Sequence, residues 1–169
     1  MTPMDLKPKE EWERIVERFA LDTRMTACLT DDKGTPLICR SDRTPLCTAI
    51  RENPDAATFI CSQINTVMLR AVKKSHLPEV DLCDVGLLRI AVPICRDGEL
   101  VGLVTACGLA SKEEELCDVL VAKQLDITAG KVRELAQETP FGSETDLTRA
   151  GARLFLDLNP KPFPKEKRQ

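Results

Sequence analysis

The chain has 169 residues, of which 43% are hydrophobic and 30% are charged, so it fits a soluble globular domain and not a disordered protein. Its net charge of −3 at pH 7 gives no basic surface for nucleic acid, and no apolar run approaches the ~20 residues that span a bilayer. Acidic side chains occupy the N-terminal 20 residues, where a secretion signal needs an apolar core. We therefore expect a cytoplasmic protein that binds neither nucleic acid nor membrane.

The first half of the chain predicts a helix, a hairpin and a second helix. Residues 7–23 carry apolar side chains at helical spacing, with charged residues between them. Residues 26–39 alternate like two strands around the turn DDKG, whose Asp and Gly suit a tight hairpin. Pro54 interrupts the next segment, after which residues 58–74 have the pattern of a helix.

The clearest β signal lies over residues 87–108, LLRIAVPICRDGELVGLVTACG. Two apolar, β-branched runs flank Asp97 and Gly98, a dipeptide that favours a two-residue hairpin turn. Pairing across this turn, with Ile94 opposite Val101, places Cys107 opposite Leu88.

The C-terminal part of the chain predicts three helices and a tail. Ser111 and Glu114 have the spacing of a capping box, which predicts a helix over 111–125. Asp126 is a candidate cap for a second helix that follows directly, and residues 142–158 form a final amphipathic helix. Residues 159–169, NPKPFPKEKRQ, are Pro-rich and basic, and we expect them to be extended or disordered.

The order of these elements indicates an α+β fold. Two hairpins can join into one antiparallel sheet, and helices before, between and after them can cover it. We expect residues 1–158 to form a single domain, with a small cavity between the sheet and its covering helices.

Eight cysteines accompany a single histidine, His76. A cytoplasmic domain with an ordinary core needs no disulfide framework, and its compartment keeps thiols reduced. Three interpretations remain: buried thiols acting as small hydrophobic side chains, ligands of a metal or cluster, and redox-active thiols.

The spaced pattern of cysteines and glycines resembles the PocR-type sensory domain, a ligand-binding module related to the PAS fold. The resemblance rests on GTPL, LCTAIREN, CSQINTVMLRAV, CDVGL, VPICRDGELVGLVTACG and KQLDI, taken in this order. It covers roughly residues 10–158. It implies a PAS-like antiparallel sheet with covering and C-terminal helices, and a role in sensing a small molecule, such as a short diol, without catalysis.

The resemblance also identifies three recurrent cysteines, Cys47, Cys61 and Cys83. Each is expected at the edge of a helix or strand, and in a PAS-like sheet these edges meet at the mouth of the cavity. A helix N-terminus would also lower the thiol pKa. Cys107 is the natural fourth member, because it ends the strand that pairs with the one after Cys83.

Four thiolates would suit tetrahedral Zn²⁺ or an iron–sulfur cluster. No CxxC pair anchors this set, however, so buried or redox-active thiols remain an alternative of about equal weight. Cys39 and His76 are reserve candidates for the fourth ligand, although a loop histidine is more often simply at the surface.

The remaining cysteines have plainer roles. Cys28 lies within a predicted strand and Cys117 on a predicted helix, and both are expected to be small core side chains. Cys95 lies beside the hairpin turn, where strand alternation places it at the surface. Asp84 could hydrogen-bond a diol or cap the turn after Cys83.

The sequence is therefore consistent with three functions. The first is a sensory domain that binds a small molecule, a cysteine-ligated metal or a cluster, and signals to a partner protein through its C-terminal helices. The second is a zinc-stabilised interaction module. The third is a thiol enzyme with Cys47 or Cys83 as nucleophile and His76 as the base. A homodimer could form through the apolar stripe of EEWERIVERFA.

Overall fold

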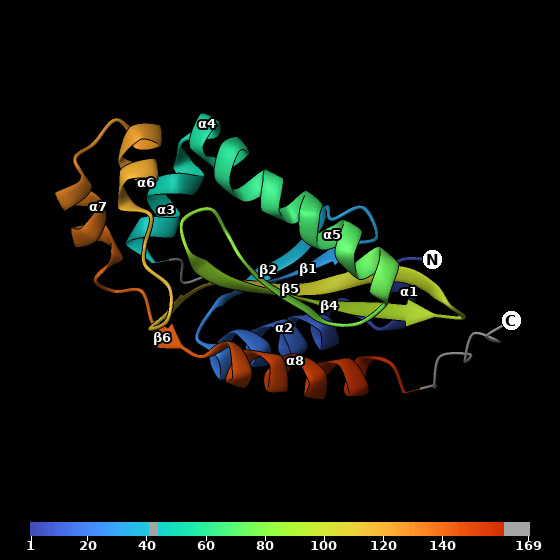
Figure 1. The fold of residues 1–169 in the computed structure, drawn as a ribbon. Helices are drawn as coiled ribbons and strands as arrows, with labels where there is room; N and C mark the ends of the chain where they lie inside the picture. Colours follow the sequence, from blue (N-terminus) through green and yellow to red (C-terminus); the bar gives the residue numbers. More distant parts are fainter. Residues whose placement is uncertain (41–43, 161–169) are drawn as a thin grey trace, which may run out of the picture.

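The computed structural model describes residues 1–40 and 44–160, and most of the predicted tail therefore lies outside the described residues. One sheet runs through the middle of the molecule with helices on both of its faces (Figure 1). In chain order the elements are α1 (Pro3–Leu6), α2 (Lys9–Thr23), β1 (Thr26–Asp31), β2 (Pro36–Arg40), α3 (Pro45–Glu52), α4 (Pro54–Ala56), the π-helix η1 (Ala57–Ser62), α5 (Gln63–Ser75), β3 (Glu79–Leu82), β4 (Leu87–Arg96), β5 (Glu99–Ser111), α6 (Asp118–Leu125), α7 (Ala129–Ala136), β6 (Phe141–Gly142) and α8 (Glu144–Leu158).

The sheet has the strand order β2-β1-β5-β4-β3, and all of these neighbours pair antiparallel. The two-residue β6 adds a short parallel pairing at the end of β5. The predicted α+β class, with a PAS-like antiparallel sheet and covering helices, is confirmed. Among the described residues, no helix combines the length and the apolar character needed to cross a bilayer.

The central hairpin of β4 and β5 turns where the sequence predicts. Asp97 and Gly98 both have positive φ, at 52° and 86°, as a two-residue hairpin turn of the mirror-image type requires. The predicted register holds beside the turn, but it shifts by one residue between Ile94 and Cys95. Because of this bulge, Cys107 pairs with Arg89 and not with Leu88.

One face of the sheet is covered by α2 and α8 and carries the largest apolar core. Trp12 is 1% exposed there, and its indole Nε1 donates a hydrogen bond to the Pro3 carbonyl oxygen at 2.8 Å. Val16 and Phe19 follow it on the same buried stripe of α2. The stripe therefore packs within its own domain, and pairing of two copies through this helix stays a prediction.

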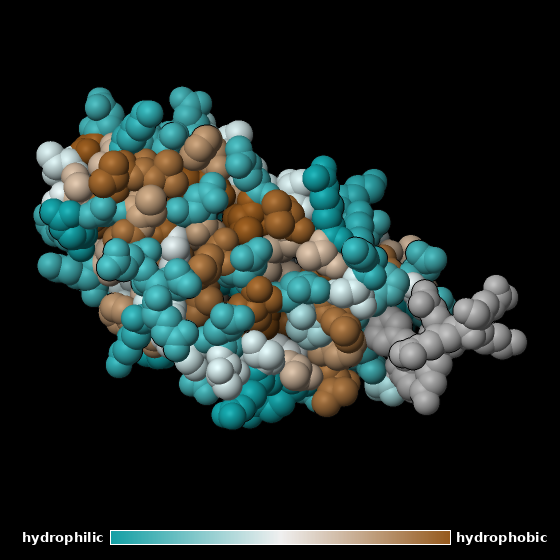
Figure 2. All heavy atoms as spheres, in the orientation of Figure 1, coloured by the Kyte–Doolittle hydropathy of each residue, from teal (hydrophilic) through white to brown (hydrophobic). Residues whose placement is uncertain are grey.

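The opposite face is covered by α5 over β4 and β5, where Met68 and Val72 pack on Ala91 and Leu103. A third apolar cluster joins α3, η1, α6 and α7 at one end of the sheet (Figure 1). On the face drawn in Figure 2, hydrophobic residues gather over this same end, between hydrophilic ones. The exposed Val119 of α6 belongs to this end.

The predicted helix over 111–125 begins too early. Ser111 is the last residue of β5, and its hydroxyl accepts a hydrogen bond from the Glu113 backbone N–H at 3.1 Å, which forms a turn. The helix begins only at Asp118. Asp126 does not cap the next helix but ends α6 in the left-handed conformation, and Thr128 caps α7.

Three short elements have no counterpart among the predictions. The strand β3 is only four residues long, β6 only two, and α1 only four. The π-helix η1 lies inside the helix predicted over 58–74, because helical periodicity does not distinguish a π-turn from an α-turn.

Candidate functional site

A small cavity of about 30 Å³ lies between α3, η1 and the adjacent ends of the sheet strands. This is room for roughly one water molecule. All four predicted cysteines line it, and its other walls are largely apolar. The complete lining is Thr26, Cys47, Ile50, Arg51, Ile60, Cys61, Cys83, Val85, Leu87, Arg89, Cys107 and Gly108. We call this the thiol cavity.

Cys47 reaches the thiol cavity from the first turn of α3. Thr44 caps this helix, and its hydroxyl accepts a hydrogen bond from the Cys47 backbone N–H at 3.5 Å. Pro45 takes the first helical position, where its missing N–H costs nothing. The thiol is thus held at a fixed position on the sheet side of α3.

Cys61 and Cys83 come from two irregular segments. Cys61 lies in η1, and π-helical turns are frequent at functional sites because they re-aim side chains. Cys83 lies in the turn between β3 and β4, where its N–H donates to the Leu87 carbonyl oxygen at 2.9 Å and its carbonyl accepts from Gly86 at 2.8 Å. Gly86 has φ +91°, which closes this tight turn.

Cys107 is placed by a second bulge in the central hairpin. Leu88 pairs with Leu109 and Arg89 pairs with Cys107, so Gly108 has no partner on β4. Gly108 has φ +99°, and a Cβ atom built on it would lie 3.6 Å from the Cys47 Sγ atom. The bulge therefore brings the end of β5 against the Cys47 thiol.

Burial raises the pKa of two thiols of this cavity, Cys47 and Cys83. Desolvation is the largest cause that raises the pKa of Cys47 from 9.0 to about 11, and the neighbouring Cys107, Cys83 and Cys61 raise it further. The pKa of Cys83 is also raised, mainly by desolvation, although the Arg89 guanidinium acts in the opposite direction. The expectation that the helix N-terminus lowers the pKa of Cys47 is therefore wrong, because burial outweighs it.

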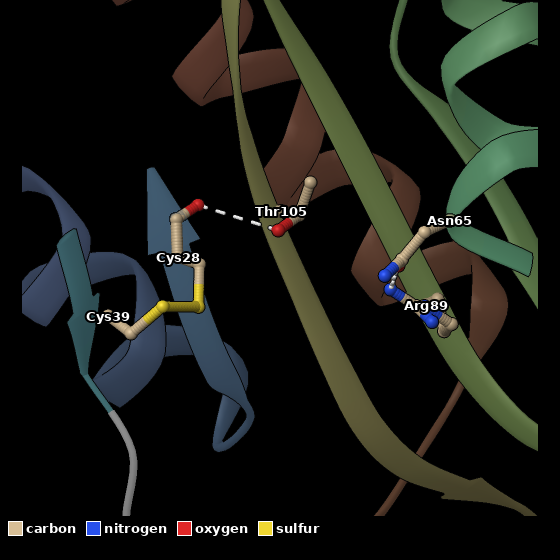
Figure 3. Close-up of a disulfide and its surroundings, with 5 residues drawn as sticks. All are labelled: Cys28, Cys39, Asn65, Arg89 and Thr105. Carbon is tan, nitrogen blue, oxygen red and sulfur yellow. Dashed lines mark hydrogen bonds between the residues drawn. A yellow bond between two sulfur atoms is a disulfide. The ribbon is translucent and has the colours of Figure 1, made fainter. Parts of the chain in front are cut away.

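Cys39, a reserve ligand, is not available to the thiol cavity. Cys28 and Cys39 are directly opposite each other on β1 and β2, with Cα atoms 4.1 Å apart, and they form a disulfide (Figure 3). The predictions that Cys28 is an isolated core thiol and that the chain has no disulfide are wrong. Two cysteines that share one register position on adjacent strands are within bonding reach.

Two further cysteine predictions are wrong. Cys95 is buried, with 5% of its surface exposed, because β4 is covered on both faces from Leu87 to Cys95. Asn159 at the end of α8 also accepts a hydrogen bond from the Cys95 backbone N–H at 2.7 Å. Cys117 is exposed, because it precedes the late start of α6.

His76 and Asp84 do not line the thiol cavity. His76 ends α5 in the left-handed conformation, at the end of that helix away from η1. Asp84 is exposed in the turn that follows Cys83. In the described part of the chain, no three Cys, His, Asp or Glu side chains are close enough together to bind one metal ion.

Arg89 is the site residue that sequence reasoning missed. It is 6% exposed, lies in the middle of the sheet beside Cys107 and lines the thiol cavity. A signal was present in the sequence, since Arg89 is the only charged residue between Leu87 and Cys95. Charged side chains are almost never this buried unless they are paired with another group.

Comparisons with known proteins bear on this geometry. The chain matches the sensory domain found in PocR over residues 5–156. No curated protein matches it. Among solved structures it is similar to the C-terminal domain of a Vibrio cholerae protein described as a transcriptional regulator, with 14% identity and a TM-score of 0.39 over 80% of this chain and 98% of that one. The match over residues 5–156 shows that the chain belongs to the PocR sensory-domain family.

Proposed function

We propose that this sensory domain detects its signal at the thiol cavity, through a thiolate-bound metal ion or iron–sulfur cluster. One observation carries the proposal: four cysteines that are far apart in the sequence converge on one small cavity. Thiolates are the ligands that select Zn²⁺ and iron–sulfur clusters. We place the protein in the cytoplasm, where the free thiols of this cavity stay reduced and the Cys28–Cys39 disulfide is an exception.

The donor set fits a soft metal in its chemistry, although the described cysteines lie too far apart to bind one metal ion without moving. Loading therefore requires the side chains of Cys47, Cys61, Cys83 and Cys107 to turn further into the cavity. Because burial raises the pKa of Cys47 and Cys83, loading also displaces protons from these two thiols. The Arg89 guanidinium beside Cys83 would offset part of the negative charge that remains.

The strand β4 offers a route from this cavity to the C-terminal helix. Arg89 faces the thiol cavity, whereas its neighbour Ile90 packs in the core under α8. A Cβ atom built on Gly151 of α8 would collide with the Ile90 side chain, so helix and strand are in close contact there. A shift of β4 on ligand binding would therefore change how α8 packs on the sheet. Ligand binding would then favour one of two positions of this helix.

The alternatives make different predictions. In a zinc-stabilised interaction module, a chelator would unfold the protein. In a thiol enzyme, the nucleophile would need a lowered pKa, whereas burial raises the pKa of Cys47 to about 11. If the thiols bind no metal, the small molecule alone is the signal. Pairing of two copies and the identity of the partner protein stay predictions.

The proposal is tested by anaerobic purification, followed by an absorption spectrum and analysis of iron, sulfide and zinc on one sample. We expect bound metal in the wild type and its loss in the Cys47→Ser and Cys83→Ser variants. Cys117→Ser is the matched control, because this cysteine is exposed and does not line the cavity. Metal-free, colourless wild-type protein would exclude both the cluster and the zinc site.

A further inference from the structure

A second, larger cavity of about 220 Å³ adjoins the thiol cavity on the α5 face of the sheet. At about 30 Å³ per molecule it has room for roughly seven waters, or for one small organic ligand. Its lining includes Cys107, Thr105 and Thr30 of the sheet, the Cys28–Cys39 disulfide and residues of α5. Figure 3 shows Thr105 between this disulfide and Arg89. We call it the Arg89 cavity.

Among the described residues that line this cavity, Arg89 is the one buried cation. Its Nη2 atom donates a hydrogen bond to the Asn65 Oδ1 atom on α5 (Figure 3). Its Nε atom is fully buried and has no hydrogen-bond partner. None of the ion pairs between described residues includes Arg89.

This arrangement leaves the Nε–H group of Arg89 without an acceptor among the described residues. A guanidinium presents Nε–H and an Nη–H side by side, and this pair matches the two oxygens of a carboxylate. Asn65 accepts from Nη2 alone, so the buried Nε–H has no partner, and a carboxylate could pair with it once the side chains that cover this atom move aside. A buried cation that has no carboxylate partner among the described residues is satisfied when a ligand brings one.

The rest of the cavity wall indicates the shape of the ligand. Thr105 and Thr30 provide hydroxyl groups, whereas Met68, Leu69 and Leu103 form an apolar wall. One buried cation at one end and an apolar wall elsewhere favour a ligand with one negative group and a short hydrocarbon part. Arg51 also lines the cavity, but it is exposed and lies at its rim.

We propose that the Arg89 cavity binds a small monocarboxylate, with the carboxylate on the Nε edge of Arg89 and the hydrocarbon part against Met68, Leu69 and Leu103. This inference rests on the proposed sensory role and names its ligand class, but it does not require a metal in the thiol cavity. Because Arg89 lines both cavities, such a ligand would lie next to the thiols and share their route through β4.

The test uses the whole chain in two forms. One is the wild type, and the other is the Cys47→Ser variant, which lacks one proposed metal ligand. Acetate, propionate and butyrate are titrated by calorimetry and by amide chemical shifts, with sodium chloride at equal ionic strength as the blank. Propionamide and propane-1,2-diol serve as uncharged probes of similar size. We expect propionate or butyrate to bind at least about tenfold more tightly than either uncharged probe, because only a carboxylate pairs with the guanidinium edge.

Variants then assign the binding to Arg89. Arg89→Gln should abolish carboxylate binding, whereas Arg70→Gln, at an exposed arginine on α5, should leave it unchanged. If Arg89→Gln does not fold, two measurements still test the proposal. They are carboxylate binding by the Thr105→Val variant and the comparison of propionate with propionamide on wild-type protein. Equal affinity for the amide, binding that survives in folded Arg89→Gln, or no binding of any of the three carboxylates would overturn the proposal. Carboxylate binding without bound metal would support it even if the metal site is wrong.

Discussion

The two faces of the sheet are built on different principles. Under α2 and α8, the side chains of the strands are almost all apolar and fully buried, and they form one continuous core. Under α3, η1 and α5, the same strands present Cys107, Thr105 and Arg89, and two cavities remain between sheet and helices. One face therefore stabilises the fold, and the other leaves polar and reactive groups arranged around open space.

The largest expected effect lies on the packed face. Trp12→Ala removes a fully buried indole and its hydrogen bond to Pro3, and should lower the free energy of unfolding by about 3–5 kcal/mol. Leu69→Ala, in the wall of the Arg89 cavity, should cost less than half of that because its side chain is only partly buried. Urea denaturation of both variants measures the contrast, and equal losses would contradict it.

The disulfide at the open edge of the sheet comes next. It links residues 11 apart, and closing a loop of this size stabilises a protein by about 3 kcal/mol in the chain-entropy model. Reduction with dithiothreitol should therefore lower the free energy of unfolding by about that amount. The Cys28→Ser, Cys39→Ser double variant is the control, and it should not respond to the reductant.

The pH dependence of stability separates the thiol cavity from the core. The pKa of Cys47 is about 11 in the folded protein against 9.0 ordinarily, so its contribution is complete below pH 9 and is lost as the pH rises toward 11. Wild-type protein, reduced and metal-free, should lose up to about 2 kcal/mol between pH 8 and 10.5 through this thiol.

Cys47→Ala should remove this part of the loss. Cys95, whose pKa burial also raises to about 11, titrates in both proteins and cancels in the comparison. Urea denaturation at both pH values gives the difference between the two slopes. Identical pH slopes for wild type and Cys47→Ala would show that the thiol is not buried as described.

The smallest effect concerns the contact between α8 and β4 on the packed face. Gly151→Ala places a methyl group against Ile90, and this overpacking of about 1–3 kcal/mol is partly offset by about 1 kcal/mol of helix propensity. The net destabilisation by urea denaturation should be at most about 2 kcal/mol. Gly130→Ala on α7 is the control, because a Cβ atom there has no contact shorter than 3.8 Å, and it should be neutral or stabilising.

The sequence predicted the four-cysteine set because each member lies near the end or turn of an element, and such ends meet around one cavity. It misplaced the partner of Cys107 by one residue, since a bulge in a regular apolar strand leaves no compositional mark. Cys95 was misplaced because alternation assumes one exposed face, whereas β4 is buried on both. Pairing of Cys28 with Cys39 depends on a register that the turn sequence alone does not fix.

The most direct test of the thiol cavity is a map of cysteine labelling, read by mass spectrometry, in metal-loaded and metal-stripped protein. The account predicts that Cys47, Cys61, Cys83 and Cys107 become protected together on loading, whereas the exposed Cys117 is labelled equally in both states. If added Zn²⁺ or a reconstituted iron–sulfur cluster leaves these four cysteines as reactive as in stripped protein, the cavity is not a metal site and the proposed sensing mechanism is wrong.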